Sequence, residues 1–200
     1  MRSPVDVAAL HDQLHRLDLP AAWIEALDTE QAGARAGVAL DRPAWFHVGG
    51  GWIDPRGLAR SFLKRAGTST ELRCGQAVSA LRRDDAGWTL LGSAGRPIVR
   101  ASTVVLACAG EALSLAGGAW PVASVRGQLS IVRGATAAGW HLPSRPVTGA
   151  GYLLPAVDGS AVFGATAQVG DVDPCVRIDD HRRNLEQVTR LVAPAAAPHR

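Results

Sequence analysis

Cysteine and methionine are both scarce in this 200-residue chain, which contains three cysteines and one methionine. The cysteines are Cys74, Cys108 and Cys175, an odd number at wide spacing. This pattern excludes a disulfide framework and a Cys-x-x-Cys metal site. We therefore expect three buried, unpaired thiols that have no functional role.

Long apolar runs are missing as well. No run approaches the roughly 18 residues that span a bilayer, and residues 1–10 lack the charged-then-apolar pattern of a secretory leader. The sequence therefore predicts a cytoplasmic protein that makes no membrane contact.

Histidines with metal-ligand spacing are almost absent. The one helical i, i+4 pair is His11 and His15, with no glutamate between them and no third ligand nearby. This arrangement favours a solvated helix face over a zinc site, and we expect no bound metal.

The charges are nearly balanced, with 21 basic and 18 acidic residues, and the sequence pI is about 9.1. This balance permits nucleic-acid contact without requiring it. A helix is predicted over 54–66, and four basic residues would line its exposed side: Arg56, Arg60, Lys64 and Arg65. This side of the helix is either a contact surface for tRNA or an ordinary solvated surface.

The most informative stretch that is present covers residues 148–167, TGAGYLLPAVDGSAVFGATA. Its first arm carries Tyr152, the only tyrosine of the chain, and residues 162–164 return as the second arm. Between the arms, Asp158-Gly159 is a dipeptide suited to positive φ angles. The stretch therefore predicts a β-hairpin.

Three further blocks precede the hairpin. Residues 121–132 predict a strand that carries Arg126 and Gln128, and residues 103–110 form an apolar run typical of a buried strand. In the third block, Gly49-Gly50-Gly51 leads to Asp54 as an N-cap and Pro55 at the first helical position.

The chain as a whole predicts an α/β (α+β) fold. We expect a helical segment over 1–48, where Asp28 and Gln31 have capping-box spacing and Gly37 can end the helix. Strands are expected over 71–74, 77–82, 88–92 and 104–108, and a helix over 180–192. These elements divide the chain into four segments: a helical segment (1–48), part of a cofactor-binding subdomain (49–117), an antiparallel substrate-binding sheet (118–179), and a helix with a disordered end (180–200).

In this order the blocks resemble the glycine oxidase and D-amino-acid oxidase family of FAD-dependent oxidoreductases. The likeness extends over residues 19–192 and rests on seven short motifs in family order, each weak alone. They are PAAWIEALDTEQAGARAGVAL, GGGWIDP, LRRDDAGWTLL, VVLACAG, SVRGQLS, GYLLP and FGATAQVGD. Within the family the chain looks most like the C-terminal oxidoreductase half of bacterial bifunctional tRNA-modifying proteins.

The resemblance implies a partial FAD-binding fold. The strand, Gly-x-Gly-x-x-Gly turn and helix that receive the FAD pyrophosphate in this family have no counterpart in these 200 residues. Gly49-Gly50-Gly51 lacks the flanking strand and spacing of that turn. We therefore expect an internal piece of a larger protein that lacks the N-terminal βαβ unit.

The resemblance also implies which residues form the site. Tyr152 corresponds to a substrate-side tyrosine that hydrogen-bonds a carboxylate, with an ordinary core tyrosine as the alternative. Arg126 and Gln128 correspond to positions near the substrate, although they could simply face solvent. Five residues are expected on the cofactor side: Gly50, Gly51, Val78, Ala109 and Gly110.

The implied reaction is oxidation of the carboxymethylaminomethyl group on the wobble 2-thiouridine of tRNA, which leaves the aminomethyl form. The implied partners are FAD, tRNA and an N-terminal methyltransferase domain in the same chain. Two alternatives stay open, namely an oxidase of small amino acids such as glycine or sarcosine, and an inactive truncated remnant.

Overall fold

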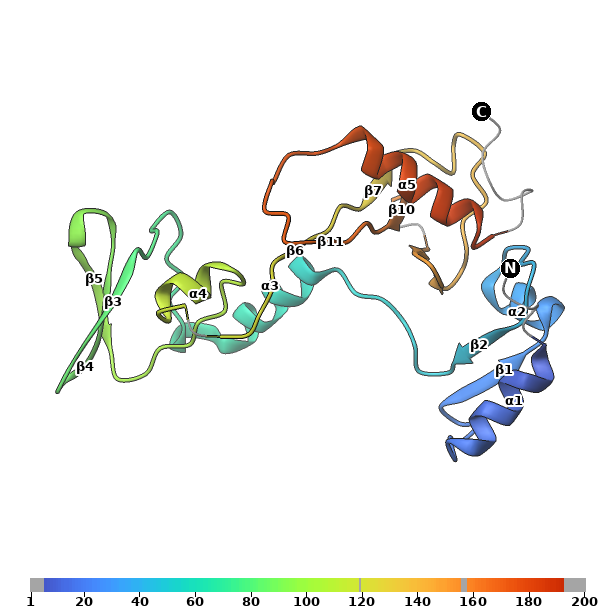
Figure 1. Cartoon of the computed structure of the whole chain (residues 1–200), viewed down its shortest axis with the longest axis horizontal. Helices are drawn as coiled ribbons and strands as arrows, with labels where there is room; N and C mark the ends of the chain where they lie inside the picture. Colours follow the sequence, from blue (N-terminus) through green and yellow to red (C-terminus); the bar gives the residue numbers. More distant parts are fainter. Residues whose placement is uncertain (1–5, 119, 156–157, 193–200) are drawn as a thin grey trace. The chain divides into compact units, whose positions relative to one another are not determined.

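A computed structural model describes residues 6–118, 120–155 and 158–192 (Figure 1). The chain forms two compact units. The first unit joins Met1–Ile53 with Val125–Arg200, and the second unit is Asp54–Ser124. The expected disordered end falls mostly on residues 193–200, which lie outside the described residues.

The described residues of the first unit form three helices and most of the strands. Its helices are α1 (Val7–Arg16), α2 (Thr29–Ala36) and α5 (Ile178–Thr189). Its strands are β1 (Ile24–Leu27), β2 (Ala44–His47), β6 (Val125–Arg126), β7 (Ser130–Val132), β8 (Val147–Thr148), β9 (Tyr152–Leu153), β10 (Ala161–Gly164) and β11 (Gln168–Val169).

Strands β1 and β2 pair antiparallel within the segment expected to be helical. The prediction of a helical segment over 1–48 is therefore wrong in part, because short runs rich in apolar and aromatic residues pair with each other across α2. The cap predictions for α2 are confirmed. Asp28 and Gln31 form the capping box, and Gly37 ends the helix with a φ of +74°.

A four-stranded antiparallel sheet forms the centre of the first unit, in the order β7-β10-β9-β8. The hairpin prediction is confirmed, since β9 pairs with β10 and the turn residues Asp158 and Gly159 have φ angles of 59° and 76°. Helix α5 contacts both of these strands. The buried side chains of this core are Ala36, Val38, Ala135, Leu153, Ala161, Phe163, Val188 and Val192.

Helix α5 buries a face that is partly polar. Leu185 is exposed, whereas Asp180, Asn184 and Val188 are buried at i, i+4 and i+8. Two of these three side chains are polar. The Asp180 carboxylate accepts hydrogen bonds from Arg126 and Gln168. The side-chain nitrogen of Asn184 donates to the Gln128 carbonyl oxygen, while its side-chain oxygen has no partner among the described residues.

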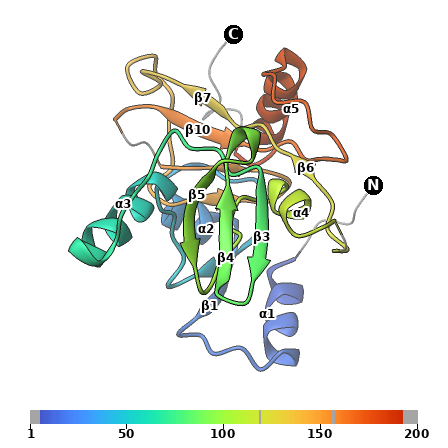
Figure 2. The same cartoon turned by 90° about the vertical axis from the view of Figure 1, so that its left-hand side faces the viewer.

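The second unit is a helix followed by a small sheet. It contains α3 (Pro55–Ala66), η1 (Gly67–Ser69), β3 (Ala80–Asp84), β4 (Gly87–Leu91), η2 (Ser93–Gly95), β5 (Pro97–Ala101) and α4 (Glu111–Leu115). Figure 2 shows β3, β4 and β5 side by side as an antiparallel meander. The predicted helix start is confirmed, because the Asp54 side chain accepts hydrogen bonds from the backbone amides of Arg56 and Gly57.

Two predicted strands of the second unit, 71–74 and 104–108, are not strands in the structure. A strand requires a neighbour for its backbone groups, and no described strand pairs with either segment. The expectation of buried thiols is also wrong, since Cys74, Cys108 and Cys175 are all free and exposed.

Candidate functional site

Tyr152 lies half-buried on the face of the central sheet opposite the core. In strand alternation its neighbour Leu153 enters the core, so Tyr152 points to the other side. Its cross-strand partners are Thr148 on β8 and Gly164 on β10. Ile131 belongs to the same face and is exposed, while Val162 is half-buried, so this face is partly open to solvent.

A cavity of about 240 Å³ opens at the β8 edge of this sheet. Residues from α2, β2, the glycine segment and β8 line it together, among them Gly50, Gly51 and Thr148. Thr148 is the cross-strand partner of Tyr152. The structure therefore brings the two predicted glycines close to the strand pair that carries the predicted substrate tyrosine.

Two arginines dominate the charge of this cavity. The guanidinium carbons of Arg35 and Arg145 lie 4.7 Å and 5.3 Å from the ring centroid of Phe46. A guanidinium nitrogen of Arg35 also lies 3.4 Å from a carboxylate oxygen of Glu25, which does not line the cavity. No acidic side chain of the described residues lines the cavity. No motif in the sequence pointed to these residues, because Arg145 is far from Arg35 and Phe46 along the chain.

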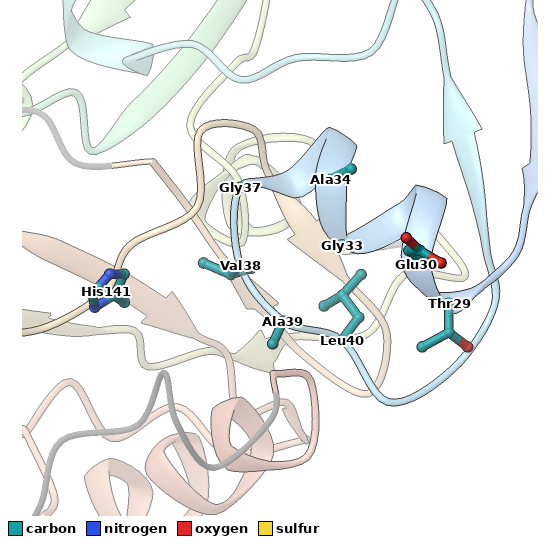
Figure 3. Close-up of a pocket in the computed structure, with 9 residues that line it drawn as sticks. All are labelled: Thr29, Glu30, Gly33, Ala34, Gly37, Val38, Ala39, Leu40 and His141. Carbon is teal, nitrogen blue, oxygen red and sulfur yellow. The ribbon is translucent and has the colours of Figure 1, made fainter.

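A second hollow runs along α2 and the segment that follows it (Figure 3). It is larger, about 780 Å³, but its lining is mostly small or apolar. In Figure 3 His141 stands on the opposite side from Thr29 and Glu30, so these polar side chains do not converge. We therefore place the candidate site at the smaller cavity and the open sheet face.

Arg126 lies at the centre of a buried hydrogen-bond network. Its guanidinium donates to the carboxylate of Asp180 and to the amide oxygens of Gln128 and Gln168. It also donates to the carbonyl oxygens of Asp173 and Cys175. The exposed fractions of the two ion-pair side chains are 9% for Arg126 and 2% for Asp180. The guanidinium holds the pKa of the Asp180 carboxyl below its usual range.

Gln128 is buried in the same network. Its side-chain nitrogen donates to the Arg177 carbonyl oxygen at 2.8 Å, and its side-chain oxygen accepts from the Arg177 amide at 2.9 Å. The alternative that Arg126 and Gln128 simply face solvent is therefore wrong. Both side chains tie β6 and β7 to the loop before α5, and contact with a substrate stays a prediction for each.

The loop before α5 is held by a second cluster of charges. Arg177 pairs with Asp171 and Asp173, and the Arg177–Asp173 distance is 2.7 Å. Hydrogen bonds from the Arg177 guanidinium lower the pKa of both carboxyls and raise the pKa of Arg177. These charges fix the loop that supplies two carbonyl acceptors to Arg126.

The other predicted cofactor residues lie in the second unit. Val78 is half-buried just before β3, while Ala109 and Gly110 are exposed at the start of α4. Ala109 has a φ of 50°, and a side chain on Gly110 would meet no atom within 4 Å. Their cofactor role stays a prediction.

Within 6–118, 120–155 and 158–192, no group of three or more potential metal ligands comes together. The same ranges contain no helix that is long and apolar enough to cross a membrane.

Comparison with known proteins shows which family this is. The FAD dependent oxidoreductase family matches residues 2–199. The chain belongs to this family. It is 39% identical over 175 residues to the tRNA 5-methylaminomethyl-2-thiouridine biosynthesis bifunctional protein MnmC of Methylibium petroleiphilum, covering 84% of this chain and 26% of that protein. The protein of the same name from Ralstonia nicotianae is 36% identical over 200 residues, covering 96% and 30%. The chain thus spans less than a third of the length of these relatives.

Solved structures of two oxidases share the fold of this chain over about half of their own length. Glycine oxidase from Bacillus cereus matches with a TM-score of 0.74 at 19% identity, covering 93% of this chain and 51% of that one. Iminodiacetate oxidase from Chelativorans sp. matches with a TM-score of 0.68 at 25% identity, covering 96% and 54%. The predicted glycine oxidase-like α/β fold with an antiparallel sheet is confirmed.

Proposed function

We propose that this chain is part of the oxidoreductase half of a bifunctional tRNA-modifying protein. In this role it would oxidise the carboxymethylaminomethyl group of wobble 2-thiouridine and leave the aminomethyl form. The observation that carries the proposal is the half-buried Tyr152 on the open sheet face, beside a cavity lined by two arginines and two glycines. The similarity to proteins named for this modification supports the choice of substrate.

The described residues fit one part of FAD. The open face beside Tyr152 and the cavity at Gly50 and Gly51 can border a flat ring and a small substrate. Gly49-Gly50-Gly51 follows β2 and precedes α3, so the expectation that this segment has no flanking strand is wrong. It still lacks the Gly-x-Gly-x-x-Gly spacing of a dinucleotide-binding loop, so we do not assign the diphosphate contacts to it. When bound, FAD supplies the acceptor for the hydride that leaves the substrate carbon.

The chain's own residues would position the substrate. Oxidation requires the carbon next to the amine nitrogen to be oriented and water to be excluded, and no acid–base triad is needed. Tyr152 can donate a hydrogen bond to a carboxylate, because its phenol carries an O–H group. We therefore assign Tyr152 to substrate placement through the carboxylate of the carboxymethyl group.

The partners follow from the same proposal. A tRNA would present the modified uridine, and a methyltransferase domain in the same chain would act on the aminomethyl product. The basic face of α3 would be a minor contact for that tRNA. A cytoplasmic location fits this substrate and stays a prediction.

Iminodiacetate oxidase favours a second candidate function. Iminodiacetate and the carboxymethylaminomethyl group both contain an amine that carries a carboxymethyl substituent, and that enzyme matches this chain at 25% identity. The second candidate is therefore oxidation of a small N-carboxymethyl amine that is free in solution.

Substitution of Tyr152 by phenylalanine in the full-length protein that carries this chain tests the proposal. A hydrogen bond to a charged acceptor contributes about 1.5–3 kcal/mol, so Tyr152→Phe should raise the apparent KM for the modified tRNA roughly tenfold or more. The FAD content should not change. Phe62→Leu, on the exposed side of α3, is the matched control and should leave the KM unchanged.

Three other outcomes would contradict parts of the proposal. Loss of FAD with unchanged KM would place the hairpin on the cofactor side. Turnover of iminodiacetate or sarcosine with no turnover of tRNA would favour the second candidate. Lack of any amine oxidation by the FAD-loaded protein would support an inactive remnant.

A further inference from the structure

The cavity at the β8 edge contains a cationic group that the oxidation step does not use. It consists of Arg35, Phe46 and Arg145, which we call the arginine cradle. Arg35 comes from α2 and Phe46 from β2, two elements that pack together, while Arg145 comes from the segment before β8. Three separate parts of the first unit therefore supply this group.

The arginine cradle carries an excess of positive charge. Both guanidinium groups approach the same aromatic ring, within 4.7 Å and 5.3 Å of its centroid. Arg35 has a partner in Glu25 at 3.4 Å, but Arg145 makes no ion pair or side-chain hydrogen bond with any residue of the described ranges. Two cations on one ring repel each other, and an anion bound between them would offset that repulsion.

The geometry favours a particular kind of anion. A guanidinium that stacks on a ring keeps its N–H donors in the plane of the group, where they form a fork that matches phosphate or carboxylate oxygens. Arg145 is exposed, and the Arg35 side chain is 50% exposed, so both forks are reached from solvent. A carboxylate beside the carbon to be oxidised needs a site that excludes water, whereas an RNA phosphate stays at the surface.

We propose that the arginine cradle binds a backbone phosphate of the RNA strand that carries the substrate nucleotide. The proposal rests on the tRNA function proposed above. Thr148 connects the two places, because it lines the cavity of the arginine cradle and is also the cross-strand partner of Tyr152. A phosphate held by Arg145 would set the register of the strand, while Tyr152 places the modified group.

The test uses the full-length, FAD-loaded protein and an anticodon stem-loop RNA that has an unmodified uridine at the wobble position. This probe has the phosphates but lacks the carboxymethyl group. Arg145→Gln should weaken its binding roughly tenfold and should lower the slope of log affinity against log salt by roughly 0.7, the value for one phosphate contact on a single strand. Arg145→Lys should keep most of the slope, and Arg145→Glu should weaken binding more than Arg145→Gln.

The matched control is Arg182→Gln. Arg182 is an exposed arginine on α5 that pairs with Asp179 at 2.7 Å, so its replacement makes the same change in formal charge away from the arginine cradle. This variant should bind the probe with less than a twofold change. An equal loss for both variants would show a general charge effect and would overturn the site.

The remaining outcomes separate this site from the proposed function. Unchanged affinity and salt slope in Arg145→Gln would overturn the arginine cradle even if the wild-type protein oxidises the modified tRNA. An effect seen only with RNA that carries the carboxymethylaminomethyl group would assign Arg145 to the carboxylate and overturn the phosphate contact. If the protein oxidises no tRNA but its binding to the probe still depends on Arg145, the phosphate site is supported and the oxidase function is rejected. A wild-type protein that does not bind the probe would overturn both.

Discussion

The two units of this chain differ in how their elements are held. The first unit has buried hydrophobic clusters, with Leu153 and Phe163 at the centre of one and Leu10 and Ile24 in the other. In the described part of the second unit no hydrophobic side chain is buried, and α3 buries none of its residues. Helix capping and strand pairing form the elements of the second unit, and the apolar side chains of its described residues are at most half-buried.

Helices and strands can therefore form in a region whose described residues bury no hydrophobic side chain. The second unit exposes large apolar side chains, including Phe62, Leu72 and Val105. Exposed apolar surface of this kind marks contacts with other protein surfaces or a tendency to associate. We therefore expect the second unit to open at lower free energy than the first unit in the isolated chain.

The largest expected effect is a difference in the free energy of unfolding between variants of two phenylalanines, one in each unit. Phe163 is 3% exposed in the first unit, where its ring stacks on Trp140 with centroids 5.9 Å apart. Phe163→Ala should lower the free energy of unfolding of the first unit by about 3–5 kcal/mol, because it removes buried area and leaves a cavity. Phe62 is 62% exposed, and Phe62→Ala should change the stability of the second unit by less than about 1 kcal/mol.

Hydrogen exchange measures this contrast, since amides of β9 and β10 report on the first unit and amides of β3 and β4 on the second. If Phe163→Ala and Phe62→Ala caused an equal loss of amide protection in their respective units, the two units would not differ in their dependence on buried apolar side chains.

The next effect distinguishes two ion pairs. Arg126 is buried against Asp180 in the first unit, whereas Arg100 and Asp84 form an exposed pair at 2.8 Å in the second. Arg126→Met should destabilise the first unit by about 3–5 kcal/mol, because it removes the closer of the two guanidinium groups that pair with the buried carboxylate of Asp180. Arg100→Met should cost no more than about 1 kcal/mol. Denaturant unfolding of each variant, followed by tryptophan fluorescence, provides the measurement, and similar shifts for both would count against a buried network.

The smallest effect is a difference in acid sensitivity. In the first unit, arginine side chains lower the pKa values of four carboxyls, those of Asp41, Asp171, Asp173 and Asp180. A carboxyl whose pKa is lower in the folded state than in the unfolded state stabilises the fold at pH values above its unfolded-state pKa, about 3.9. This stabilisation is lost as the pH falls through the folded-state pKa. Unfolding curves between pH 7 and pH 2 should therefore show the first unit losing stability below about pH 4.

Arg177→Met should flatten this pH dependence, because Arg177 is the partner of Asp171 and Asp173. The control in the second unit is Arg73→Met, which removes the exposed partner of Glu71. We expect no measurable change in acid sensitivity from that variant, and a change as large as that of Arg177→Met would show that the loop charges have no special role.

The sequence determined the local features of this protein and its family. The Asp54 cap of α3, the capping box of Asp28 with Gln31, and the Asp158-Gly159 turn each depend on residues within a few positions of one another. Their physical basis is short-range hydrogen bonding and backbone preference, which a linear pattern contains. The order of the motifs was enough to indicate the FAD dependent oxidoreductase family.

Contacts between side chains that are distant along the chain could be seen only in the folded structure. The strands predicted over 71–74 and 104–108 did not form, because a strand depends on neighbours that its own residues do not specify. The buried polar face of α5 and the internal bonding of Arg126 depend on elements that meet only in the folded chain. The arginine cradle likewise joins Arg145 to residues of α2 and β2 through the topology of the first unit, and no local pattern encodes that approach.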